Sequence, residues 1–147
     1  MFNSIVVGTD GSDTANEAVK QAIELAKSVG ASIALVSAYE PVSDARLKRE
    51  SVEVPEELSW MVNPREDVDN TLKEAAEEVE AAGVKVEVFA RQGDPADSIL
   101  DVAEEQGSDL IIVGNKGMTG AKRFVLGSVP NKVSHHAPCS VMIIRTT

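Results

Sequence analysis

Short apolar runs alternate along the chain with longer stretches in which apolar residues recur every three or four positions. The runs are typical of buried strands, and the periodic stretches are typical of amphipathic helices. They predict strands over 2–8, 32–39, 84–90, 109–113 and 140–145, and helices over 14–29, 64–82, 95–106 and 128–136. Strict alternation of continuous apolar strands with helices predicts an α/β protein with a parallel sheet and helices on both faces.

Capping signals mark the ends of the predicted helices. Thr14 with Glu17 three residues later has the form of a capping box, and Asp13 is also expected to cap this helix. Asp94-Pro95 predicts an N-cap followed by a proline in the first turn. Glycine follows three helices as a stop signal: Gly30, Gly83 and Gly107.

Residues 40–63 form the least regular stretch of the chain. They contain prolines and many charges, show little periodicity, and exceed the usual length of a loop. We interpret them as a mobile or partly helical surface insertion within one domain that spans residues 1–147.

The order of the strands follows from the positions of the loops that contain glycine. Right-handed crossovers leave two candidate orders, 3-2-1-4-5 and 2-1-3-4-5. In the first order the loops at 9–13 and 114–127 follow neighbouring strands and face each other across a crevice. Because these two loops contain glycine, we expect the order 3-2-1-4-5. Independently of the loops, the strong apolarity of strand 109–113 predicts that this strand is central.

Composition is that of an ordinary globular protein. The 147 residues are 43% apolar and only 3% aromatic, so the core must be aliphatic, and a single cysteine, Cys139, excludes an intramolecular disulfide. No apolar run approaches the roughly 20 residues of a membrane-spanning helix. The amino terminus lacks a basic stretch followed by a long apolar one. We therefore expect a cytoplasmic protein with no membrane partner.

The net charge of −10 is unevenly distributed. An acidic surface repels polyanions, which disfavours binding to nucleic acid. Residues 110–147 nevertheless contain no acid and five bases: Lys116, Lys122, Arg123, Lys132 and Arg145. This last quarter could hold a small phosphorylated ligand. Alternatively, the acids simply crowd onto solvated helix faces elsewhere.

The loop after the fourth strand contains the glycine pattern G-x2-G-x9-G-S, at Gly114, Gly117, Gly127 and Ser128. Glycine lets a backbone approach a ligand closely, and the last two positions open a helix whose free N–H groups attract an anion. The pattern also suits a plain strand-to-helix loop. It is neither a Walker loop nor GxGxxG, which argues against a motor ATPase and a hydride-transferring dehydrogenase.

These features resemble the universal stress protein family. The G-x2-G-x9-G-S loop, the amino-terminal VVGTDGS and the closing PCSVMIIR match motifs of the family, and the resemblance extends over nearly the whole chain. It implies a nucleotide-binding α-hydrolase-like fold with the order 3-2-1-4-5. It also implies an adenine nucleotide in the crevice, which is ATP in members with this loop.

The resemblance further implies a set of ligand contacts. Thr9, Asp10 and Gly11 match positions near ribose and phosphate. Val36 matches a position that touches the adenine. The loop and the start of the last helix supply the rest of the expected site: Gly114, Asn115, Lys116, Gly117, Met118, Gly127, Ser128 and Val129.

Asp10 is the only acid near both glycine loops. Its carboxylate could bind a ribose hydroxyl, hold Mg²⁺ through water, or cap the following helix. We expect no other metal site, because the adjacent His135 and His136 point in different directions on a helix. Cys139 is expected to be a small apolar residue rather than a nucleophile.

Pro130 departs from the family pattern, which often has Ser or Thr at this position. Proline lacks the N–H and the hydroxyl that a third phosphate would contact, so AMP or cyclic AMP becomes an alternative to ATP.

No set of residues supports an efficient hydrolase. We expect a stress-response protein that senses or sequesters adenine nucleotide. The alternatives are a slow ATPase or phosphotransferase, and an interaction protein that binds no nucleotide.

The last strand is apolar on both sides and lies at an edge of the expected sheet. Bare edges invite pairing with another strand. We expect a homodimer in which two copies of this strand pair antiparallel about a two-fold axis, through Val141, Met142, Ile143 and Ile144.

Overall fold

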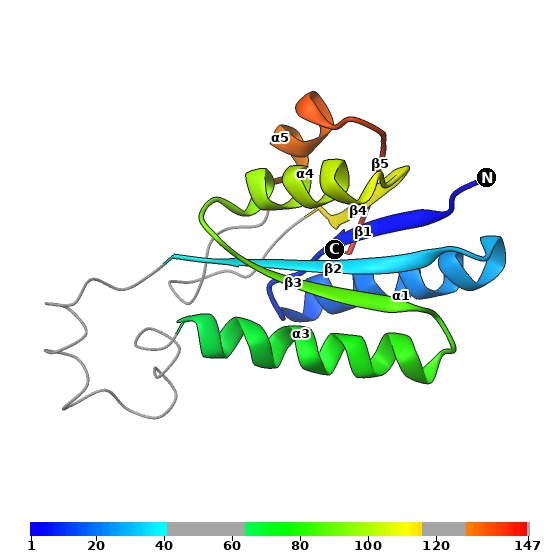
Figure 1. The fold of residues 1–147 in the computed structure, drawn as a ribbon, viewed down its shortest axis with the longest axis horizontal. Coiled ribbons are helices and arrows are strands. Elements are labelled where there is room, and N and C mark those ends of the chain that lie inside the picture. Colours follow the sequence, from blue (N-terminus) through cyan, green and yellow to red (C-terminus); the bar gives the residue numbers. More distant parts are fainter. Residues whose placement is uncertain (41–63, 116–128, 147) are drawn as a thin grey trace, which may run out of the picture.

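The computed structural model describes residues 1–40, 64–115 and 129–146 (Figure 1). In these residues strands and helices alternate as predicted, with ends that differ by one or two positions. The elements are β1 (Ser4–Gly8), α1 (Asp13–Val29), β2 (Ser32–Tyr39), α3 (Pro64–Ala81), β3 (Val86–Gln92), α4 (Pro95–Gln106), β4 (Leu110–Gly114), α5 (Val129–His136) and β5 (Ser140–Ile144). Apart from Glu40, the insertion predicted at 40–63 lies outside the described residues.

The five strands form one parallel sheet in the order β3-β2-β1-β4-β5. This confirms the expected order and excludes 2-1-3-4-5. The central strand is β1, so the prediction that strand 109–113 is central was wrong. β4 is nonetheless buried along its whole length, because helices cover both of its faces.

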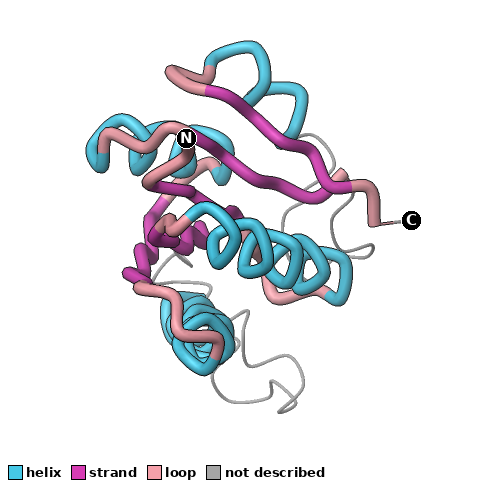
Figure 2. Tube along the Cα trace, turned by 90° about the vertical axis from the view of Figure 1, so that its right-hand side faces the viewer, coloured by secondary structure: helices cyan, strands magenta, loops and turns pink. Residues whose placement is uncertain are grey.

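In the described residues, α1 and α3 pack against one face of the sheet, and α4 and α5 pack against the other. The strands form a layer between the helices (Figures 1 and 2). On β1, Ile5 and Val7 point into the core beneath α1 and α3, whereas Val6 points into the core beneath α4. The same alternation continues on β2 and β4. Both cores are aliphatic, as the low aromatic content predicted.

The helix starts differ in part from the prediction. Ser12 is the N-cap of α1, and its Oγ accepts the N–H of Ala15 at 3.2 Å. The prediction of Asp13 and Thr14 as caps was therefore wrong, because Asp13 is already the first helical residue. The cap of α4 is Asp94 with Pro95 in the first turn, as predicted.

No helix in the described part of the chain is both long enough and apolar enough to cross a membrane.

Asp109 fastens the start of β1 to the start of β4. Its carboxylate accepts the backbone N–H of Asn3 at 2.9 and 3.1 Å, and that of Ser4 at 3.1 Å. These hydrogen bonds lower the pKa of Asp109 from its usual value, and the hydrogen bond from Asn3 has the largest effect. Asp109 therefore has a lower pKa in the folded protein than in the unfolded chain. At a pH above the pKa of the unfolded chain its carboxylate stabilises the fold, and this stabilisation is lost as the pH falls through the pKa of the folded protein.

We predict that Asp109→Ala lowers the free energy of unfolding by about 1 kcal/mol at neutral pH, because the two amides lose a charged acceptor. The difference from the natural chain should shrink as the pH falls below about 4, where the carboxyl becomes protonated in the unfolded chain. Urea denaturation at neutral pH and at about pH 3 measures both values. Asp101→Ala is the control, since Asp101 is exposed on α4. An equal loss for Asp109→Ala at both pH values would contradict the account.

Candidate functional site

The order of the strands reverses between β1 and β4. These two strands pair directly, with Val7 beside Ile112. From β1 the chain continues into α1 and β2 on one side, and from β4 it continues towards α5 and β5 on the other. In open α/β sheets the carboxyl ends of two such strands border the crevice in which ligands bind.

The turn after β1 is buried and held by its own hydrogen bonds. The N–H of Thr9 donates to the carbonyl of Val36 on β2 at 2.9 Å. Asp10 Oδ1 accepts the N–H of Ser12 at 2.9 Å, and the N–H of Gly11 donates to Thr9 Oγ1 at 3.2 Å. Gly11 has a φ of 81°, a conformation that favours glycine. Thr9 and Asp10 are 2% and 0% exposed, so a carboxylate is buried at the amino terminus of α1.

Val36 lies in the core beneath α4 and is 1% exposed. Its carbonyl joins β2 to the turn at Thr9. The structure thus brings the backbone of Val36, in the middle of β2, next to Thr9 at the carboxyl end of β1. A contact between Val36 and adenine stays a prediction.

Asn115 connects the loop after β4 to the end of β5. Its N–H donates to the carbonyl of Ile144 at 2.9 Å. Its Oδ1 accepts both the N–H of Thr146, at 2.8 Å, and the Oγ1 hydroxyl of Thr146, at 3.0 Å. The side-chain oxygen of Asn115, an expected ligand residue, therefore already accepts hydrogen bonds from Thr146. Sequence analysis missed this link, because nothing in the pattern around Thr146 distinguishes it from any other terminal residue.

The remainder of the glycine loop lies outside the described residues. This applies to Lys116, Gly117, Met118, Gly127 and Ser128. Gly114 is the last residue of β4, and Val129 opens α5 at 2% exposure. The structure thus places the two ends of the loop at the carboxyl end of β4 and at the start of α5.

Lys132 holds α5 against the start of α4. Its Nζ lies 2.9 Å from Asp97 Oδ1 and 3.2 Å from Asp94 Oδ2. Hydrogen bonds to these two carboxylates raise the pKa of Lys132, and the hydrogen bond to Asp97 has the larger effect. Of the five bases in the acid-free last quarter, Lys132 thus has its charge offset by two carboxylates at the start of α4.

The other candidate residues show no second site. His135 and His136 are exposed, and their rings are 6.5 Å apart at an interplanar angle of 59°. The described residues contain no group of three or more His, Cys, Asp or Glu side chains that could hold a metal ion. Burial, and then the charge of Asp109, raise the pKa of the Cys139 thiol, which favours its protonated form.

Comparison with known proteins identifies the family. The model of the universal stress protein family matches residues 1–145. The chain belongs to the universal stress protein family. It is 36% identical over 157 residues to the universal stress protein YxiE of Bacillus subtilis, covering 99% of this chain and 100% of that one. It is 34% identical over 148 residues to the universal stress protein MJ0531 of Methanocaldococcus jannaschii, covering 99% and 83%.

Solved structures of the universal stress protein family share this fold. A crystal structure of a universal stress protein in complex with cAMP matches with a TM-score of 0.71 and 29% identity, covering 99% of this chain and 98% of that one. The family resemblance drawn from the sequence motifs is thereby confirmed, and so is the α/β fold.

We predict that Asn115→Ala frees the carboxyl-terminal residues of this universal stress protein. The amide of Thr146 should exchange its hydrogen about fivefold faster, because it loses an acceptor whose net contribution is about 1 kcal/mol. Hydrogen exchange followed by NMR measures this rate. Asn115→Asp is the matched control, since it keeps an acceptor oxygen. Equal exchange in the natural chain and in Asn115→Ala would show that the link makes no net contribution.

Proposed function

We propose that this universal stress protein binds an adenine nucleotide in the crevice between the turn 9–12 and the loop 114–128, and that it senses or sequesters this ligand with little or no catalysis. The observation that carries the proposal is the direct pairing of β1 with β4 at the reversal of the strand order. This pairing brings both glycine-containing loops to the same edge of the sheet. We also propose a cytoplasmic location.

The chemistry of the described residues fits such a ligand. Asp10 is a buried carboxylate at the end of β1, suited to accept hydrogen bonds from ribose hydroxyls. The glycine turn at Gly11 admits a ligand close to the backbone. The first turn of α5 offers the positive end of a helix to a phosphate. A related structure, 29% identical over nearly the whole chain, is a complex with cAMP.

We further propose that a nucleotide with one phosphate, AMP or cyclic AMP, binds with an affinity comparable to that of ATP. Pro130 is buried in the first turn of α5 and has no N–H to donate. Lys132, two residues later, is occupied by Asp94 and Asp97. The helix therefore offers fewer donors to a third phosphate.

Hydrolysis of ATP, if measured, should be slow, because Asp10 is the only acid of the proposed site. Mg²⁺ would bind through Asp10 and water.

Replacing Gly117 by Leu should abolish nucleotide binding, because its side chain would fill space that the ligand needs. Isothermal titration calorimetry with cyclic AMP measures the affinity, and circular dichroism checks the fold. The control is Ser28→Leu, at an exposed position near the end of α1, away from the carboxyl ends of β1 and β4. Unchanged affinity in folded Gly117→Leu would reject the site. Denaturing the purified natural protein and analysing the released small molecules tests independently whether it carries a nucleotide.

The ratio of the affinities for ATP and cyclic AMP tests the role of Pro130. In the natural chain the two affinities should lie within about tenfold, a gap of about 1.4 kcal/mol. Pro130→Thr restores one N–H and one hydroxyl, so it should shift the ratio towards ATP by about tenfold. A thousandfold preference of the natural chain for ATP, or an unchanged ratio in the variant, would refute this proposal.

We propose that the protein forms a homodimer through β5. This strand lies at the edge of the sheet, as predicted, and Ile143 is 47% exposed. The N–H of Asn115 donates to the carbonyl of Ile144, so the peptide groups of Met142 and Ile144 face β4. In a parallel pair alternate residues face opposite sides. The groups of Val141 and Ile143 therefore face outward, where a second copy of β5 could pair with them.

Ile143→Pro should give a folded monomer, because proline removes an outward N–H and leaves the bonds to β4 in place. The natural chain should be a dimer by light scattering with size-exclusion chromatography. Met142→Pro is the contrasting variant, since it removes an N–H that faces β4 and should destabilise the sheet itself. A natural chain that stays monomeric at high micromolar concentration would contradict the dimer.

A further inference from the structure

The opposite edge of the sheet, formed by β3, is open. Within the described part of the chain β3 pairs only with β2. The N–H of Ile33 donates to the carbonyl of Lys85 at 2.9 Å, and the N–H of Gly93 donates to the carbonyl of Tyr39 at 2.8 Å. The odd-numbered residues of this segment thus face β2. The even-numbered ones turn their N–H and C=O groups outward, which exposes a row of donors and acceptors.

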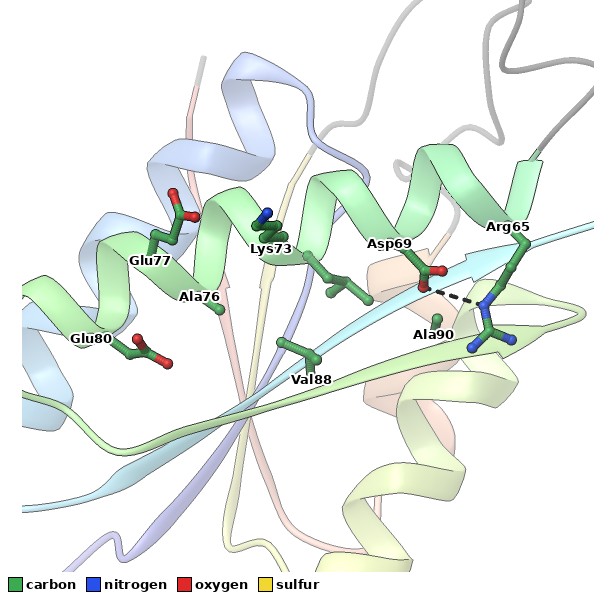
Figure 3. A pocket seen from close by; sticks show the side chains of 9 residues that line it. Arg65, Asp69, Lys73, Ala76, Glu77, Glu80, Val88 and Ala90 are labelled. Carbon is green, nitrogen blue, oxygen red and sulfur yellow. Dashed lines mark hydrogen bonds and ion pairs between the residues drawn. The ribbon is translucent and has the colours of Figure 1, made fainter.

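An apolar groove runs beside this open edge, between α3 and β3, with a volume of about 490 Å³ (Figure 3). Ala76 of α3 and Val88 of β3 point towards one another across it. Leu72 and Ala90 complete its apolar lining. Val88 is 47% exposed, which is high for a large aliphatic side chain in a sheet. The side chains of a strand added beside β3 would bury this surface.

The two ends of the groove differ in charge. At the end near Ala90, the Nε of Arg65 lies 3.2 Å from Asp69 Oδ1, so the two charges offset each other. At the other end stand Glu77 and Glu80, both exposed, and neither forms an ion pair with a described residue. Glu80 extends towards β3, while Glu77 lies on the outer side of α3 (Figure 3). Lys73 is the one base beside them, so this end carries a net negative charge.

We propose that the β3 edge and this groove bind an extended peptide segment of another protein, apolar beside Val88 and basic beside Glu80. The segment would add a further strand to the sheet, with its backbone paired to the even-numbered residues of β3. Its apolar side chains would fill the groove over Val88 and Ala90. Its Lys or Arg would lie next to the carboxylate of Glu80, which extends towards β3, and Glu77 adds negative charge at the same end of the groove.

The negative charge of the β3 edge favours binding of a basic peptide over binding of a second copy of this acidic chain. A two-fold pairing of two β3 edges would run antiparallel and would bring the exposed Glu87 of each copy to the shared edge, in a protein of net charge −10. Like charges at an interface disfavour the pairing. The β5 edge differs, because residues 110–147 contain no acid. The two edges of one sheet thus suit different partners.

A fluorescein-labelled peptide, Thr-Lys-Thr-Val-Thr-Val-Thr, is the probe for this surface. In a strand parallel to β3 its lysine lies at the level of Val86, and its valines lie at the levels of Val88 and Ala90. We expect saturable binding to the natural chain by fluorescence anisotropy. A peptide with Glu in place of Lys should bind about fivefold more weakly or worse. A peptide with N-methyl groups on alternate amides, which cannot pair with a strand, should not bind.

Variants of the protein locate the binding. Val88→Glu and the double variant Glu77→Lys/Glu80→Lys should each weaken binding of the lysine peptide about fivefold or more. The matched control is Glu74→Lys/Glu78→Lys, which makes the same charge change on the face of α3 that lines a different cavity. Circular dichroism checks that each variant folds.

Three results would overturn the proposal. The first is no binding of the lysine peptide at millimolar concentration. The second is equal binding by the N-methylated peptide, or equal weakening in the control double variant, which would reveal non-specific attraction. The third is a smaller oligomer for Val88→Glu than for the natural chain in light scattering, which would show that a second copy occupies the edge.

Discussion

The pairing of β1 with β4 is the interaction on which the candidate site depends. Ile5 lies beside Leu110 and Val7 beside Ile112, at the centre of a sheet buried on both faces. Burial of both faces specifies this register, since a slip by one residue would exchange the side chains between the two cores. The carboxyl ends of these two strands therefore lie side by side, and the chain continues from them towards opposite edges of the sheet.

Hydrogen bonds of the site residues reach well beyond the crevice. Asn115 joins the first residue after β4 to Thr146, which follows the strand through which we propose that two copies pair. Lys132 joins α5 to the capped start of α4. The residues at the two ends of the glycine loop are thus anchored to β5 and to α4. Because two carboxylates offset the charge of Lys132, we expect a bound phosphate to be attracted chiefly by backbone N–H groups and by the bases within the loop.

Sequence periodicity was sufficient to predict the strands, the helices and the sheet order, because each strand is a continuous apolar run and both loops at the reversal contain glycine. It misplaced β4 at the centre, since high apolarity there reflects cover by helices on both faces. It also put the start of α1 one residue late, because Ser12 caps the helix before the apparent capping box at Thr14. The pairing of Lys132 with Asp94, 38 residues apart, depends on how two helices pack, which periodicity does not encode.

Titration of isotope-labelled protein with cyclic AMP, followed by amide chemical shifts, tests most directly whether the reversal between β1 and β4 forms the ligand site. The account predicts saturable shifts at Thr9–Ser12, Gly114 and Val129, with little change along α3 and β3. Shifts confined to residues away from the carboxyl ends of β1 and β4, or no saturable change, would contradict it.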